Sequence, residues 1–173
     1  MRISFFYLIL LFLIPQISLA ISEAEEYEIK AAYLFNLGNF IKWPATSQDS
    51  FEICVLGQDV FKENLDLIAK KEKKLQNKLV VIKKLSSLDD VNQCSILFIN
   101  FTEQSQFQAA FDKLKGKPIL TVGDTEKFII MGGMIQFYLQ AGKIRLMIDP
   151  QTLDENNLKA SSKLLQISQR VER

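Results

Sequence analysis

The segment of residues 29–44, IKAAYLFNLGNFIKWP, restricts the fold of this 173-residue chain more than any other segment. Its apolar residues recur at helical spacing on almost every side, which predicts a helix that is buried inside a fold or against a partner. Only a narrow polar strip breaks this pattern, and it consists of Asn36, Asn39 and Lys42. Because Pro44 cannot continue a helix and biases Trp43 toward an extended backbone, we expect the helix to end at this Trp-Pro pair.

Residues 1–20 have the pattern of a secretory signal peptide. Arg2 gives a positive start, residues 5–14 form an unbroken apolar run that Pro15 interrupts, and a small-x-small cleavage site ends the segment. The apolar run is shorter than the roughly 20 residues of a membrane span, although an uncleaved N-terminal anchor remains the alternative. We therefore expect residues 1–20 to be removed on export and residues 21–173 to form one domain in the periplasm.

The composition argues against several classes of function. Arg2 is the only charged residue among residues 1–20, so the exported chain has 20 Lys and Arg against 20 Asp and Glu. This balance gives no reason to expect nucleic acid as a partner. The chain has no histidine, which removes the commonest general base and a common metal ligand. Asp124 and Glu126 could form an acid–base pair, but a solvated loop explains them better. We expect no catalytic residue, no metal and no cofactor.

Two cysteines, Cys54 and Cys94, lie beside predicted strands. An even number of cysteines in an exported protein predicts a disulfide, and parallel pairing of the two strands could bring these residues together. Two buried free thiols are the alternative. A redox-active pair is less favoured, because catalytic thiols usually form a close C-x-x-C motif. We expect a structural bridge.

Strands and amphipathic helices alternate after the first helix. The predicted strands are residues 51–56, 79–85, 95–100 and 118–122, and the predicted helices are residues 59–71, a short helix from Ser86, and residues 102–115. Residues 134–139 and 143–149 then form a predicted hairpin, and residues 158–171 a final helix. This order predicts a single α/β domain with a mixed, mostly parallel sheet, helices on both faces and a late antiparallel hairpin.

Five blocks of this sequence resemble the YfiR-like periplasmic proteins of Gram-negative bacteria. The blocks are IKAAYLFNLGNFIKWP (residues 29–44), ICVLG (53–57), CSILFIN (94–100), ILTVGDTEKFIIMGGMIQF (119–137) and KIRLMIDPQTLDENNLKASSKLL (143–165). The first and the last two, in this order behind a signal peptide, are specific together. The resemblance covers nearly the whole exported chain.

The resemblance implies a non-enzymatic regulator that binds and represses an inner-membrane diguanylate cyclase, lowering cyclic-di-GMP and biofilm formation. An outer-membrane lipoprotein or redox stress on the cysteines would release the partner, and the protein could form a homodimer. The alternative is a small-molecule-binding accessory of a sensor kinase or transport system. The resemblance also implies that Cys54 and Cys94 are the inter-strand pair of the family, whereas further cysteines of some members are absent here.

Trp43 is the candidate partner-binding residue. A chain with 13 Phe, 4 Tyr and 1 Trp but without catalytic groups is suited to work through apolar contacts. Trp is over-represented among the residues that dominate protein interfaces. The alternative is a ring that packs on the sheet and fixes the corner between helix and strand.

Overall fold

The computed structural model describes residues 21–45 and 47–171, so the predicted signal peptide, residues 1–20, lies outside the described residues. The helices are α1 (Glu23–Phe40), α2 (Asn64–Glu72), the 3-10 helix η1 (Leu88–Gln93), α3 (Gln104–Leu114), α4 (Pro150–Glu155) and α5 (Ser162–Ile167). The strands are β1 (Ile41–Lys42), β2 (Ser50–Gly57), β3 (Lys74–Leu75), β4 (Lys78–Leu85), β5 (Cys94–Asn100), β6 (Leu120–Gly123), β7 (Ile135–Gln140), β8 (Lys143–Ile148), β9 (Lys159–Ala160) and β10 (Gln169–Arg170).

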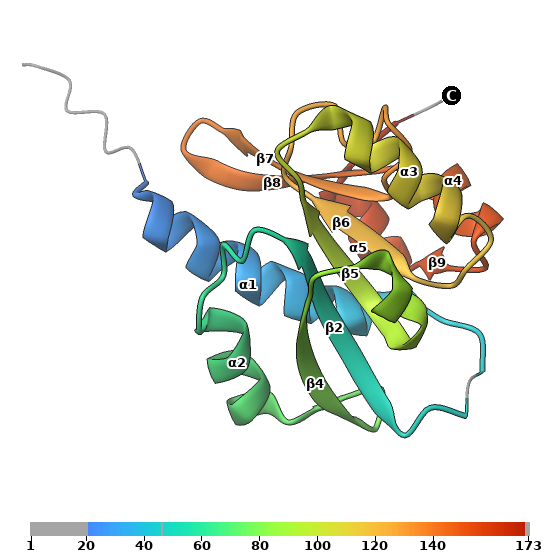
Figure 1. Ribbon diagram of the computed structural model, residues 1–173. Helices are drawn as coiled ribbons and strands as arrows, with labels where there is room; N and C mark the ends of the chain where they lie inside the picture. Colours follow the sequence, from blue (N-terminus) through green and yellow to red (C-terminus); the bar gives the residue numbers. More distant parts are fainter. Residues whose placement is uncertain (1–20, 46, 172–173) are drawn as a thin grey trace, which may run out of the picture.

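Among the described residues, eight strands form one sheet in the order β10-β8-β7-β6-β5-β2-β4-β3 (Figure 1). The central strands, from β7 through β6, β5 and β2 to β4, are all parallel to their neighbours. Strand β8 returns antiparallel to β7 as the late hairpin, and β3 is antiparallel to β4. The predicted mixed, mostly parallel sheet is therefore confirmed.

Helices cover both faces of the sheet (Figure 1). On one face α1 and α2 pack on the side chains of Ile53, Ile96 and Phe98, and this cluster continues along β6, β7 and β8. On the other face α3 and η1 pack on a smaller cluster that includes Leu97 and Ile99. Successive side chains of β5 point alternately into the two clusters, as expected for a strand that is buried on both faces.

Helix α1 begins earlier and ends earlier than the sequence predicts. It starts at Glu23 because Ser22 and Glu25 form a capping box, in which each side chain accepts a hydrogen bond from the backbone of the other residue. It ends at Phe40, and the next residue, Ile41, is already extended and belongs to β1. The predicted end at Trp43-Pro44 is therefore too late, but the predicted polar strip is exposed.

The prediction of one helix over residues 158–171 is wrong. Residues 159–160 form β9, which pairs with β1 next to the end of α1, and residues 169–170 form β10, which pairs with β8. Between them lies the short helix α5, whose first turn is capped by the Ser161 side chain. Long-range pairing at both ends therefore overrides the helical spacing. Leu164 is buried as predicted, whereas Ile167 is 57% exposed.

Two other helices begin later than the sequence predicts. Helix α2 starts at Asn64 and not at residue 59, because Lys62 has a φ of 53°, which an α-helix excludes. The short helix predicted from Ser86 is the 3-10 helix η1, whose capping residue is Ser87. These differences leave the order of the elements unchanged.

Candidate functional site

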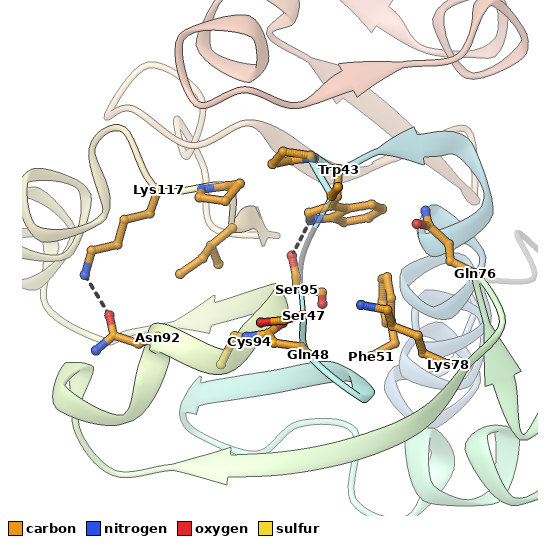
Figure 2. Close-up of a pocket in the computed structure, with 14 residues that line it drawn as sticks. Trp43, Ser47, Gln48, Phe51, Gln76, Lys78, Asn92, Cys94, Ser95 and Lys117 are labelled. Atoms are coloured by element: carbon orange, nitrogen blue, oxygen red, sulfur yellow. Dashed lines mark hydrogen bonds between the residues drawn. The ribbon is translucent and has the colours of Figure 1, made fainter.

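A groove of about 780 Å³ lies at the edge of the sheet where the parallel strands begin (Figure 2). The segment that follows β1, the first residues of β2 and β5, and the segment before β6 form its walls. Its apolar lining residues include Trp43, Pro44, Phe51, Pro118 and Ile119. Ligands of parallel α/β sheets usually bind at the opposite, carboxyl ends of the strands. At the carboxyl ends of β2 and β5 in this protein, the two chain segments are in contact, because the backbone N–H of Gln58 donates a hydrogen bond to the carbonyl oxygen of Asn100 at 3.0 Å.

Trp43 contributes to this groove and to the packing of the sheet. Its Nε1 donates a hydrogen bond to the carbonyl oxygen of Ser95 at 3.2 Å. Its ring meets the ring of Phe51 edge to face, with centroids 5.1 Å apart and an angle of 85° between the planes. The side chain is half-buried. The ring therefore packs on the sheet, as the alternative interpretation expects, while the residue also lines the groove. Its role in partner binding stays a prediction.

The charged side chains that line the groove are Lys78 and Lys117, and its lining residues include no Asp or Glu. The ammonium group of Lys117 donates a hydrogen bond to Oδ1 of Asn92 at 2.9 Å across one end of the groove (Figure 2). Apolar walls with lysines at the rim suit a ligand or peptide segment that carries a carboxylate beside an apolar group.

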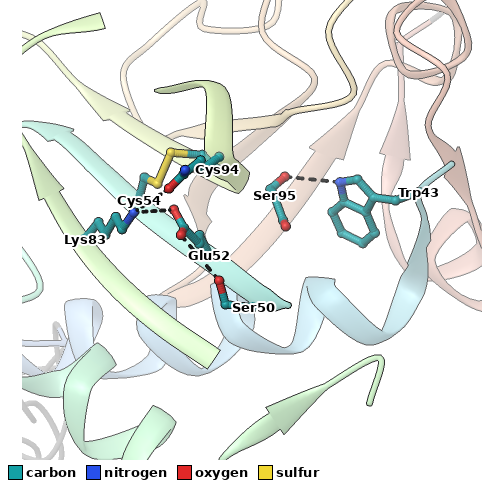
Figure 3. Close-up of a disulfide and its surroundings, with 8 residues drawn as sticks. Trp43, Ser50, Glu52, Cys54, Lys83, Cys94 and Ser95 are labelled. Carbon is teal, nitrogen blue, oxygen red and sulfur yellow. Dashed lines mark hydrogen bonds and ion pairs between the residues drawn. A yellow bond between two sulfur atoms is a disulfide. The ribbon is translucent and has the colours of Figure 1, made fainter. Parts of the chain in front are cut away.

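The disulfide joins Cys54 in β2 to Cys94 at the start of β5, with the Cα atoms 5.9 Å apart (Figure 3). These are the two cysteines that the sequence pairs. Both residues are almost completely buried, and Cys94 also lines the groove. The disulfide thus links the two central strands beside the groove.

A bulge in β5 puts Cys94 on the correct face of the sheet. In β2, Glu52 pairs with Cys94 and the next residue, Ile53, pairs with Ile96, so Ser95 has no partner and is the extra residue of the bulge. As a result Cys94 shares a face with Leu97 and not with Ile96. That face also carries Cys54. Strict alternation along β5 would have pointed Cys94 away from its partner.

A buried carboxylate lies against the disulfide (Figure 3). The ligand atoms of Glu52, Cys54 and Cys94 lie within 4.8 Å of one another, and Glu52 is only 5% exposed. The Lys83 ammonium is 2.9 Å from Glu52 Oε2 as an ion pair. That contact lacks hydrogen-bond alignment, so Oε2 is buried without a hydrogen-bond donor among the described residues. Lys83 donates instead to Gln93 Oε1 at 3.0 Å.

Asp124 does not form the acid–base pair with Glu126 that the sequence allowed. Glu126 is exposed, whereas Oδ2 of Asp124 accepts hydrogen bonds from the Tyr27 hydroxyl at 2.9 Å and from Lys30 Nζ at 2.6 Å. Lys30 is also 2.5 Å from a carboxylate oxygen of Glu26. Burial, and then the adjacent charge of Asp124, raise the pKa of Tyr27. This buried cluster attaches α1 to the end of β6.

The sequence matches the YfiR/HmsC-like family over residues 27–169, from within α1 to the start of β10. The chain belongs to the YfiR/HmsC-like family. Membership of this family points to a periplasmic regulator of cyclic-di-GMP signalling and to a non-catalytic role. No helix in residues 21–45 and 47–171 of this YfiR/HmsC-like chain is long and apolar enough to cross a membrane.

A solved structure with a similar fold is the ABC domain in complex with L-Trp from Streptococcus pneumoniae. The TM-score is 0.51 at 10% sequence identity, and the match covers 82% of this chain and 60% of that chain. The YfiR/HmsC-like chain thus spans less than two thirds of that chain, and the likeness shows the fold alone. No curated protein matches the sequence.

Sequence reasoning did not identify Glu52, Lys83 and Ser95 as parts of this site. A signal for Glu52 was present, because a carboxylate two residues from Cys54 in a strand faces the same side. A charged residue inside an otherwise apolar strand is also rare unless it is paired. The bulge at Ser95 has no comparable signal in the sequence.

Proposed function

We propose that this YfiR/HmsC-like protein binds and represses an inner-membrane diguanylate cyclase from the periplasm, and so lowers cyclic-di-GMP and restrains biofilm formation. The family match over residues 27–169 carries the proposal. Repression would be a population shift, in which the bound protein favours the inactive arrangement of its partner. Such a shift needs roughly 5.5 kcal/mol of differential affinity, which an interface of about 1,600 Å² can supply. An outer-membrane lipoprotein that sequesters the repressor would release the cyclase.

The groove is the surface that we propose for the partner. Its wall presents the half-buried ring of Trp43, and Lys78 and Lys117 are the charged residues of its lining. An aromatic anchor flanked by charges that steer the partner is the usual arrangement of an interface centre and its rim. A periplasmic segment of the cyclase with an apolar side chain next to a carboxylate would match it.

The proposal is tested by measuring cellular cyclic-di-GMP in a strain that lacks the gene, with and without the restored gene. We expect the level to rise on deletion and to return on complementation. An unchanged level would reject repression of a diguanylate cyclase. Cross-linking from the restored protein would then identify the cyclase that it contacts.

The role of the groove is tested with Trp43→Ala as the complementing gene. Ile130→Ala is the matched control, because Ile130 is 75% exposed and does not line the groove. We expect the Trp43 variant to leave cyclic-di-GMP high and the Ile130 variant to restore the low level. Circular dichroism of both purified variants checks that they are folded. A folded Trp43 variant that represses fully would exclude Trp43 as an anchor.

The alternative function is that of a small-molecule-binding accessory of a sensor kinase or transport system. The volume of the groove, about 780 Å³, supports it, because ligand pockets usually measure about 300–1,000 Å³. Native mass spectrometry of the protein purified from its own periplasm would reveal a retained ligand as added mass. Trp43→Ala should lose that mass if the ligand occupies the groove.

A further inference from the structure

We propose that Glu52, Cys54 and Cys94 form a three-ligand metal site once the disulfide is reduced. The site would bind a thiophilic divalent ion such as Zn²⁺. The proposal goes beyond the regulatory function and does not depend on it. In the oxidised protein the two sulfur atoms are bonded to each other, so the metal-bound form and the disulfide form exclude one another.

The geometry suits a tetrahedral ion. The two sulfur atoms and a carboxylate oxygen lie within 4.8 Å of one another. Ligands at about 2.3 Å for sulfur and about 2.1 Å for oxygen are spaced by roughly 3.5–3.8 Å around a tetrahedral zinc ion. After reduction the two sulfur atoms would separate to this spacing by rotation of the Cys54 and Cys94 side chains. Water would complete the coordination.

The carboxylate is available as a ligand. Glu52 is 5% exposed, and its Oε2 has no hydrogen-bond donor among the described residues although it lies on the disulfide face. Oε2 is held by the Lys83 ammonium, 2.9 Å away, without an aligned hydrogen bond, and a metal ion would give it a direct ligand bond. Thiolate ligands select zinc and related soft ions over magnesium or calcium.

The charges balance in both states. In the disulfide form Glu52 carries one negative charge and Lys83 one positive charge, 2.9 Å apart. In the metal form two thiolates and one carboxylate face one divalent ion and Lys83, so the site is again neutral. Lys83 would shift from Oε2 while its charge stays beside the site, and its side chain, 36% exposed, has room for this shift. Balanced charge matters here because the three ligands are buried.

The chemistry needs a dithiol reductant. Such a reductant transfers two electrons and two protons: the Cys54–Cys94 bond breaks, each sulfur becomes a thiol, and the two thiols of the reductant become a disulfide. The metal ion then replaces the two thiol protons, which pass to water. Cys94 lines the groove, which is the part of the site nearest to solvent-filled space.

The test uses Co²⁺ as a spectroscopic probe, because cobalt bound to thiolate gives an intense near-ultraviolet absorption band. The full exported chain is reduced with a phosphine, freed of it without oxygen, and titrated with Co²⁺, with Zn²⁺ as competitor. We expect one Co²⁺ for each reduced chain, displacement by Zn²⁺, and no band with the oxidised protein. Absence of the band from reduced protein, or an equal band from oxidised protein, would overturn the proposal.

Variants separate the three-ligand site from binding by two thiols alone. Glu52→Gln should weaken Co²⁺ binding by about tenfold or more. Asp59→Asn is the matched control: Asp59 pairs with Lys84, the residue next to Lys83, and its carboxylate is not a ligand, so affinity should stay unchanged. Equal affinity of the wild type and Glu52→Gln would remove the carboxylate from the site.

A measurement on the wild type alone guards against poor folding of the variants. Bound Zn²⁺ should slow reoxidation of Cys54 and Cys94 by oxidised glutathione at least tenfold, and an unchanged rate would count against the site. Near-ultraviolet circular dichroism follows the fold of the reduced chain. If reduction unfolds the protein, we expect Zn²⁺ to restore the signal, and failure to restore it would also overturn the proposal.

Discussion

The indole nitrogen of Trp43 donates a hydrogen bond to the carbonyl oxygen of Ser95, which is the residue directly after Cys94. Ser95 is also the extra residue of the bulge that turns Cys94 toward Cys54. The wall of the groove and the disulfide are therefore connected through one backbone segment. A partner that moves the ring of Trp43 would act directly on the backbone that positions Cys94.

Substitutions of Trp43 should separate its hydrogen bond from its packing. Trp43→Phe keeps an aromatic ring against Phe51 but loses the bond to Ser95, so we expect a loss of about 0.5–1.5 kcal/mol in the free energy of unfolding. Trp43→Ala also loses the ring contact, and we expect a larger loss, up to about 3–5 kcal/mol. Urea denaturation measures both. Equal losses for the two variants would show that the ring contributes no packing energy.

Removal of the disulfide should destabilise the chain by roughly 4 kcal/mol in the chain-entropy model, since the bridge spans a sequence separation of 40 residues. We expect Cys54→Ser and the double variant with Cys94→Ser to lose similar amounts in urea denaturation. Intact repression of cyclic-di-GMP by both variants would identify the bridge as a purely structural staple. Lost repression in variants that remain folded would instead point to a regulatory bridge. A reductant should shift the wild-type transition and leave that of the double variant unchanged, which controls for side reactions.

Asp124→Asn should destabilise the protein strongly although it preserves the shape of the side chain. The Lys30 side chain is only 4% exposed, and it would keep Glu26 as its only carboxylate partner among the described residues. Removing one partner of a buried ion pair costs about 3–5 kcal/mol in the free energy of unfolding. Because Lys30 keeps Glu26, we expect a loss of about 3 kcal/mol for this variant. Thermal and urea denaturation measure the effect.

The matched control for this substitution is Asp89→Asn. Asp89 also pairs with a lysine, Lys113, but both side chains are exposed to water. Exposed ion pairs are screened by solvent, so we expect little change in the denaturation midpoint. Equal effects of the two substitutions would contradict the view that the Asp124 cluster fixes α1 to the sheet.

The stability of the protein at alkaline pH should report on Tyr27. Burial and the adjacent Asp124 raise the pKa of Tyr27 above its ordinary value of 10. The folded chain therefore keeps a proton that the unfolded chain releases, so the stabilisation is complete below about pH 10 and is lost as the pH rises toward the folded-state pKa. We expect the urea midpoint to fall more steeply for the wild type than for Tyr27→Phe between about pH 9 and pH 11. Parallel curves would contradict the raised pKa.

Local sequence patterns correctly predicted most of the strands and helices that hydrophobic periodicity marks. The apolar runs that became β2 and β5, and the hairpin of β7 and β8, are in the predicted places. The prediction for the C-terminal segment failed because residues 159–160 pair with a strand more than 100 positions away. Spacing within a segment carries no information about such a partner. Leu158 and Leu164 are nevertheless buried as predicted. Helix α4 was not predicted, although its start carried a signal, since Asp149 caps it and proline favours a first helical position.

The candidate site was predictable only in part. The cysteines follow from their number and the predicted export signal, and Trp43 from its place at the predicted helix end and the frequency of Trp in interfaces. The cluster of Asp124 with Lys30 could not be predicted from neighbours in sequence, because the two residues are brought together only when α1 packs on the sheet. For the same reason Asp124 looked like half of a pair with Glu126, its neighbour along the chain.

The bulge at Ser95 means that two cysteines can be separated without changing either of them. If Ser95 paired regularly with β2 in place of the bulge, residues 96–100 could keep their register, but position 94 would turn to the opposite side of the sheet. Deletion of Ser95 would instead leave position 94 on the face of Cys54, because Cys94 would then directly precede Ile96. In a protein of this architecture, the count of cysteines in the sequence does not guarantee a bridge. Loss of the bulge alone, with every residue retained, would be enough to leave both thiols free.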